Sequence, residues 1–185
     1  KLAEALREKG FQVLFVEQFD HTARHAEPPK GVAVVSASQL LPGVDRYRMD
    51  YDAREAAVLT DALRKHLALA DPMLTVNCDY SCLSLENMKS LRMLGSTLVY
   101  DVMDDWEGLC AGEGGPDGNA GYAREVEAEI ISGADLVTSS ARTLAEHVSD
   151  KFGLLDVPVF VPNSLDPSFL LRPVDGRPEA LPDGG

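Results

Sequence analysis

The chain has few of the residues that are typical of disulfide-rich, membrane-spanning and nucleic-acid-binding proteins. Its 185 residues include only three cysteines, Cys78, Cys82 and Cys110, which argues against a disulfide scaffold and fits a reducing cytoplasm. No apolar run approaches the roughly 18 residues of a membrane span, and no signal peptide is visible. Lysine and arginine total 17 against 30 aspartates and glutamates, a net charge of -13. This acidity argues against sequence-independent binding of nucleic acid, which needs basic side chains to neutralise phosphates.

The amino-acid composition is typical of an ordinary globular domain. Hydrophobic residues make up 45% of the chain and charged residues 25%. Short, almost continuously apolar runs alternate with helical patterns, as in a parallel sheet that is covered on both faces. We therefore predict an α/β protein with a Rossmann-like, doubly wound parallel sheet. The expected strands are 12–17, 31–36, 72–77, 96–101, 134–139 and 157–161.

Local signals place the expected helices and the domain boundary. Residues 1–9 form a helical pattern that Gly10 ends, and Asp52 with Glu55 forms a capping box for the next long helix. Later helices are expected over 84–94, 122–132 and 140–152. A doubly wound sheet normally has a strand before its first helix, so we expect a first strand upstream and a gap beside strand 97–101. Residues 1–166 form the predicted domain, and 167–185, rich in proline, glycine and charge, form a linker.

Polar side chains follow three of the predicted strands. The stretch "YDVMDDW" places Asp101, Asp104, Asp105 and Trp106 at one strand exit. The other two exits are "TSS" and "VPNSLD". Ligands of open parallel sheets bind outside the carboxyl ends of the strands. The three exits therefore predict one polar crevice.

Four segments in this order resemble the N-terminal domain of GT-B glycosyltransferases. They are "KLAEALREKGFQVLFVEQ", "LVYDVMDDWEG", "EVEAEIISGADLVTSSARTLAEHV" and "VPVFVPNSLDPSFLLRP". The chain is similar over residues 1–172 to family-4-like bacterial enzymes of the teichuronic-acid and exopolysaccharide kind. It departs from them at Ser164, where the family usually has glycine, and at Asp104, where the wider superfamily often has histidine. The family's first strand and its glycine-rich first loop are not among these residues.

The resemblance implies a function for this segment and a separate domain for binding of the sugar donor. It implies the acceptor-binding domain of a retaining, metal-independent glycosyltransferase of cell-surface polysaccharide synthesis, acting on a sugar or lipid-linked sugar. The nucleotide-sugar donor would bind to a C-terminal domain outside these residues, so the segment is not expected to be active alone. No cofactor or metal is expected. The implied location is cytoplasmic, with contact to the inner face of the membrane open to the full-length protein.

Each acid at the "YDVMDDW" exit has two interpretations. In the functional one, Asp104 and Asp105 are catalytic, and Asp101 binds the acceptor, because carboxylates accept hydrogen bonds from hydroxyl groups and serve as general bases. In the structural one, one aspartate caps the following helix and the others are solvated. Trp106 either stacks on a sugar ring or anchors the loop.

The other two exits are open to the same two interpretations. Backbone N–H groups at Ser139 and Ser140 could bind the acceptor through a phosphate or carboxylate, or the serines cap a helix. Asn163 and Asp166 either contact the acceptor or form an ordered turn.

Two other functions remain open from the sequence. One is a polyol-phosphate transferase of the teichoic-acid type on the same GT-B scaffold, and the other is a non-catalytic, flavodoxin-like binding module. A metal site is not predicted at Cys78 and Cys82, because they lack a second ligand pair. Asp50 and Asp52 form a D-x-D sequence, but Asp52 is interpreted as a helix cap.

Overall fold

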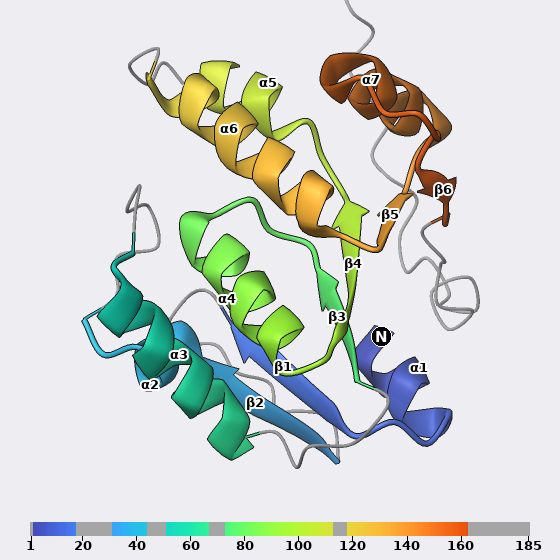
Figure 1. The fold of residues 1–185 in the computed structure, drawn as a ribbon. Coiled ribbons are helices and arrows are strands. Elements are labelled where there is room, and N and C mark those ends of the chain that lie inside the picture. The colour runs from blue at the N-terminus through green and yellow to red at the C-terminus, as the bar shows by residue number, and fades with distance from the viewer. Residues whose placement is uncertain (1, 18–30, 44–50, 67–72, 113–117, 163–185) are drawn as a thin grey trace, which may run out of the picture.

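The computed structural model describes residues 2–17, 31–43, 51–66, 73–112 and 118–162, in which helices and strands mostly alternate along the chain (Figure 1). The predictions for the linker 167–185 and for Asn163 and Asp166 lie outside the described residues. The strands are β1 Val13–Glu17, β2 Val32–Ser36, β3 Leu74–Asn77, β4 Thr97–Val102, β5 Leu136–Ser139 and β6 Val159–Phe160. The helices are α1 Leu2–Glu8, α2 Ala37–Leu40, α3 Ala53–His66, α4 Cys82–Met93, α5 Trp106–Gly112, α6 Gly118–Gly133 and α7 Arg142–Phe152.

All described strand pairs are parallel, which confirms the predicted α/β class. The strands β3-β4-β5-β6 form one sheet in sequence order, and β1 pairs with β2 in a second sheet. The expectation of a gap beside strand 97–101 is wrong, because β4 pairs with β3 on one side and β5 on the other. Among the described residues, β3 pairs only with β4, so one unpaired edge of this sheet belongs to β3.

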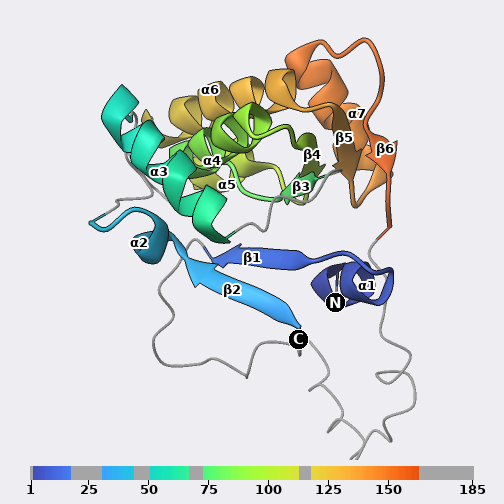
Figure 2. The same cartoon turned by 60° about the horizontal axis from the view of Figure 1, so that its bottom comes forward.

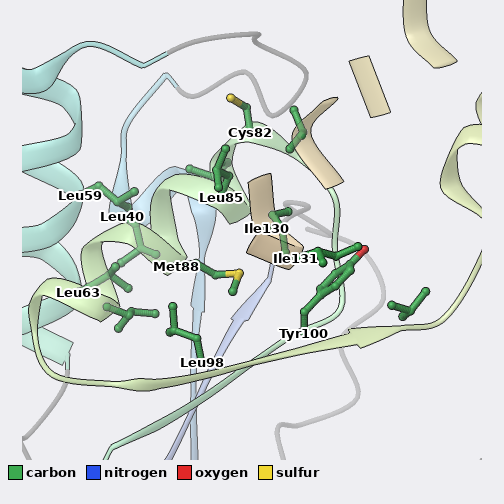
Figure 3. Close-up of a cluster of buried hydrophobic side chains, with 14 of the residues drawn as sticks. Leu40, Leu59, Leu63, Cys82, Leu85, Met88, Leu98, Tyr100, Ile130 and Ile131 are labelled. Atoms are coloured by element: carbon green, nitrogen blue, oxygen red, sulfur yellow. The ribbon is translucent and has the colours of Figure 1, made fainter. Parts of the chain in front are cut away.

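A single hydrophobic core joins the strands to the helices on one face. The side chains of Leu98 and Tyr100 in β4 are buried, as are Met88 in α4 and Ile130 in α6, and they pack together (Figure 3). These alternate residues of β4 point to one face because successive side chains of a strand point to opposite faces. The same core includes residues of β1, β2 and α3.

Local sequence signals set some helix ends and not others. The Asp52–Glu55 capping box is confirmed: Asp52 Oδ1 accepts from the Glu55 N–H at 2.8 Å, and Glu55 Oε2 accepts from the Asp52 N–H at 3.0 Å. α7 ends at Phe152, the predicted last residue, and Gly153 follows with φ of 62°, a left-handed conformation that glycine adopts readily. Two predicted starts are wrong. The N-cap of α4 is Ser81 rather than Ser84, and α7 begins after Ala141, which has no side-chain capping bond, rather than after Ser140.

Three further differences concern element lengths. The short helices α2 and α5 were not predicted, and α6 begins at Gly118, four residues before the expected start at 122. The last strand covers only Val159–Phe160 instead of 157–161. Within the described part of the chain, no helix is both long and apolar enough to cross a membrane.

Candidate functional site

The first acid of "YDVMDDW" is fixed by its neighbour in the sheet. Asp101 lies opposite Thr138 in the β4–β5 register, and the Thr138 hydroxyl donates to Asp101 Oδ1 at 2.6 Å. Both side chains point to the same face of the sheet, because partners in register share a face. Asp101 is therefore held in one orientation near the carboxyl end of β4.

The end of β3 brings a second carboxylate to the same edge. Asp79 Oδ2 accepts hydrogen bonds from the hydroxyls of Ser81, at 2.5 Å, and Ser84, at 2.8 Å, at the start of α4. Burial raises the pKa of the neighbouring Cys78 thiol to about 11, and the charges of Asp101 and Asp79 add to the shift. Cys78 is therefore a neutral thiol at physiological pH and is not an activated nucleophile.

The two adjacent acids Asp104 and Asp105 have different surroundings. Asp104 is exposed and forms no hydrogen bond or ion pair with another described residue. Asp105 precedes α5, where its carbonyl accepts from the Leu109 N–H, and its Oδ2 lies against the backbone of Gly108. Its Oδ1 lies 3.6 Å from Lys151 Nζ and 3.7 Å from His147 Nε2. Asp104 is thus free to meet a ligand, whereas Asp105 is tied to α7.

A partly buried charge network lies behind Asp105. Lys151 Nζ of α7 is 3.0 Å from Glu107 Oε2 in α5 and 3.2 Å from Glu127 Oε2 in α6. The Tyr100 hydroxyl donates to the other oxygen, Glu127 Oε1, at 3.0 Å. The Lys151 side chain is 7% exposed and that of Glu127 is 1% exposed. We name Asp105, Glu107, Glu127 and Lys151 the Lys151 cluster.

The pKa values of Glu127, Lys151 and Tyr100 are shifted in and beside the Lys151 cluster. Burial raises the pKa of Glu127, although the ammonium group of Lys151 opposes the shift. Burial alone would lower the pKa of Lys151, but its contacts with Glu107 and Glu127 outweigh burial and raise it. Burial and the charge of Glu127 also raise the pKa of Tyr100. Lys151 is therefore charged at neutral pH and neutralises part of the excess acid around it.

Trp106 packs on another aromatic side chain. Its ring lies 5.0 Å from that of Tyr80, centre to centre, with 30° between the planes. The Tyr80 hydroxyl is 3.4 Å from Cys110 Sγ in α5. These contacts link the loop after β3 to α5, which is the loop-anchoring interpretation of Trp106.

The residues at the carboxyl end of β5 are polar, but they are only partly accessible to solvent. Ser139 is fully buried, and its hydroxyl donates to the carbonyl of Ala141 at 3.1 Å. Ser140 is half-buried at the same turn. The guanidinium group of Arg142 lies 4.5 Å from the centre of the Phe160 ring in β6, a cation–π contact. Of the predicted residues at this exit, Ser140 is the more accessible.

No sequence motif identifies Glu127, Lys151, His147 or Tyr100 as site residues. A signal for Glu127 was present, because it shares a helical face with the buried Ala123 and Ile130 at spacings of four and three residues. A charged residue on an apolar helical face needs a partner of opposite charge. The sequence does not show that the partner is Lys151, which lies 24 residues away on another helix.

Within the described ranges, no group of three or more histidine, cysteine or acidic side chains is placed to hold a metal ion. No protein-family model matches the chain, and no curated protein matches it with significant similarity.

Proposed function

We propose that this chain is the acceptor-binding domain of a nucleotide-sugar-dependent glycosyltransferase that builds cell-surface polysaccharide. The proposal is carried by Asp104, an exposed carboxylate without a partner among the described residues, in the segment that leaves the carboxyl end of β4. Ligands of open parallel sheets bind beyond this edge. A carboxylate in this position accepts hydrogen bonds from sugar hydroxyls and can remove a proton from one of them.

The neighbouring residues have separate roles in this proposal. Asp101, which Thr138 holds in place, accepts a second hydrogen bond from the acceptor. Asp105 positions Asp104, because its carboxylate is tied to α7 through Lys151 and His147. Fixing a catalytic group before the substrate arrives lowers the entropic cost of reaching the reactive geometry.

The charge of the edge favours the acceptor over the donor as the ligand. Asp79, Asp101 and Asp104 place three carboxylates around the exits of β3 and β4, where a diphosphate would be repelled. A neutral glycan has hydroxyl groups to donate and no charge to be repelled. The same repulsion weighs against a polyol-phosphate transferase and against a flavodoxin-like module that binds a nucleotide, because both ligands carry phosphate. In this proposal the donor binds to a second domain.

Calorimetry on the chain tests this assignment. We expect no sub-micromolar binding of UDP-glucose or GDP-mannose, and weak binding of neutral disaccharides that Asp104→Asn reduces. Asp156→Asn, which removes an exposed acid after α7, is the matched control and should leave disaccharide binding unchanged. Tight binding of a nucleotide sugar would mean that this is a donor-binding or nucleotide-binding domain.

A further inference from the structure

Strand β6 is the outermost described strand of the larger sheet. It pairs in parallel with β5, and the described part of the chain places no strand on its other side. Both views show β6 at the outer end of the sheet, beyond β5 and on the side away from β3 (Figure 1 and Figure 2). An open strand edge presents N–H and C=O groups to which a strand of another chain can bind.

The side chains around this edge favour such binding. Val157, Val159 and Val161 are 58%, 50% and 51% exposed, and Phe160 between them is half-buried. Valine and phenylalanine are among the residues that are enriched in strands. Short apolar segments of this kind on an open edge are sites of strand addition and aggregation. The side chains therefore do not protect the edge of β6.

The backbone of residues 158–162 alternates between the two edges of β6. The Val161 N–H donates to the carbonyl of Ser139 in β5 at 2.9 Å, so the polar backbone groups of Val161 face β5. Successive residues of a strand direct these groups to opposite edges. Val159 therefore also faces β5, whereas the residues at 158, 160 and 162 face outward.

The outward positions on either side of Phe160 are both proline, Pro158 and Pro162. Proline has no backbone N–H and cannot donate to a strand ladder. Over residues 158–162, Phe160 is therefore the only residue that can donate a backbone hydrogen bond outward. Neither proline lies at a position facing β5, where it would break the existing ladder.

A second copy of the chain is the partner that this arrangement excludes most effectively. Two-fold symmetry is the commonest symmetry of protein dimers, and it would pair two β6 edges antiparallel around Phe160. Pro158 of one copy would then lie opposite Pro162 of the other, where each hydrogen-bonded pair needs two N–H groups. Only the bonds between the two Phe160 residues could form. The exposed Arg142, whose guanidinium lies 4.5 Å from the centre of the Phe160 ring, would also approach its own copy.

We propose that Pro158 and Pro162 keep the outer edge of β6 closed to strand addition by a second copy of the chain. This inference is independent of the proposed function. The two prolines offset the apolar, strand-forming side chains of the same segment. Restoring the two missing N–H groups should therefore turn this edge into an interface between copies.

Hydrogen exchange on the unmodified chain is the first test. We expect the outward Phe160 amide to exchange much faster than the Val161 amide, which donates to Ser139, at every protein concentration. Equal rates at the two amides would overturn the proposal, because β6 would then not have one paired and one open edge. A Phe160 rate that falls with protein concentration would also overturn it, because copies would already pair at this edge.

Restoring the two donors is the second test. In the Pro158→Val/Pro162→Val variant, sedimentation equilibrium should show association of copies. The Phe160 amide should then exchange at least about tenfold more slowly at high than at low protein concentration. Pro42→Val is the matched control, because Pro42 is exposed in a turn, and it should stay monomeric. A folded double variant that stays monomeric, or equal association of the control, would overturn the proposal.

Pro162→Val alone keeps the test decisive if the double variant does not fold. Pro158 is buried, so its replacement disturbs packing, whereas Pro162 is exposed. The single variant gains one outward donor beside Phe160, and we expect a weaker slowing of the Phe160 amide with protein concentration. Circular dichroism establishes that the variant is folded. A folded Pro162→Val protein whose Phe160 exchange does not depend on concentration would overturn the proposal.

Discussion

The ammonium group of Lys151 and the carboxylate of Glu127 form an ion pair that is almost completely removed from water. The two groups are 3.2 Å apart, and the side chains are 7% and 1% exposed. They connect α7 to α6, while Glu107 and Asp105 extend the contact to α5 and to the loop after β4. The pair therefore joins the scaffold to the segment that carries Asp104.

Removing Lys151 should destabilise the fold strongly. Lys151→Met leaves Glu127 buried without its cation, and removing one partner of a buried pair typically costs about 3–5 kcal/mol. The free energy of unfolding in urea measures the loss. Lys89→Met is the matched control, because Lys89 forms exposed ion pairs with Glu86 and Glu129. It should cost at most about 1 kcal/mol. Equal losses in the two variants would contradict the assigned role of the Lys151 cluster.

Gly108→Ala should also destabilise the protein, against the usual preference of helices for alanine. A Cβ at Gly108 would collide with Asp105 Oδ2, and Lys151 and His147 hold that carboxylate in place. Gly121→Ala in α6 is the control, because nothing lies within 4 Å of its Cβ. The control should be neutral or gain up to about 1 kcal/mol from helix propensity. The melting temperatures of both variants, compared with that of the wild type, test this prediction. A stabilised Gly108→Ala protein would mean that Asp105 is mobile.

Acid should weaken the contacts that Asp135, in the turn between α6 and β5, makes with β4 and α4. Asp135 Oδ2 accepts from the Leu98 N–H at 2.8 Å and Oδ1 pairs with Arg92, so the pKa of Asp135 lies below its ordinary value of 3.8. A lowered pKa contributes stability above the unfolded value and loses it as the pH falls through the folded value. Asp135→Asn should therefore lower the Tm relative to the wild type at about pH 6, and the difference should shrink at about pH 2.5. A difference independent of pH would show that the ionised form is not responsible.

Features that depend on nearby residues could be predicted from the sequence, and features that depend on distant partners could not. The Asp52–Glu55 capping box and the end of α7 at Gly153 involve residues within one turn of each other. The strand order and the pairing of Glu127 with Lys151 depend on segments that meet only in the folded chain.

In the candidate site, too, nearby residues could be predicted from the sequence and contacts with distant residues could not. The sequence places Asp104 and Asp105 together at one strand exit, and either could be the catalytic residue. Their difference arises because α7 brings Lys151 and His147 to Asp105 and brings no described side chain to Asp104. The Thr138 bond that orients Asp101 likewise depends on the β4–β5 register.

Steady-state kinetics, measured as nucleotide released from a sugar donor, test the proposed glycosyltransferase function most directly. Asp104→Asn should lower turnover by at least about tenfold, a barrier increase of roughly 1.4 kcal/mol, with almost no change in Tm because Asp104 has no described partner. Asp105→Asn should lower the Tm instead, because it weakens the contacts to Lys151 and His147. Wild-type turnover in the Asp104→Asn enzyme, or its unfolding, would contradict the assignment of this sheet edge as the acceptor site.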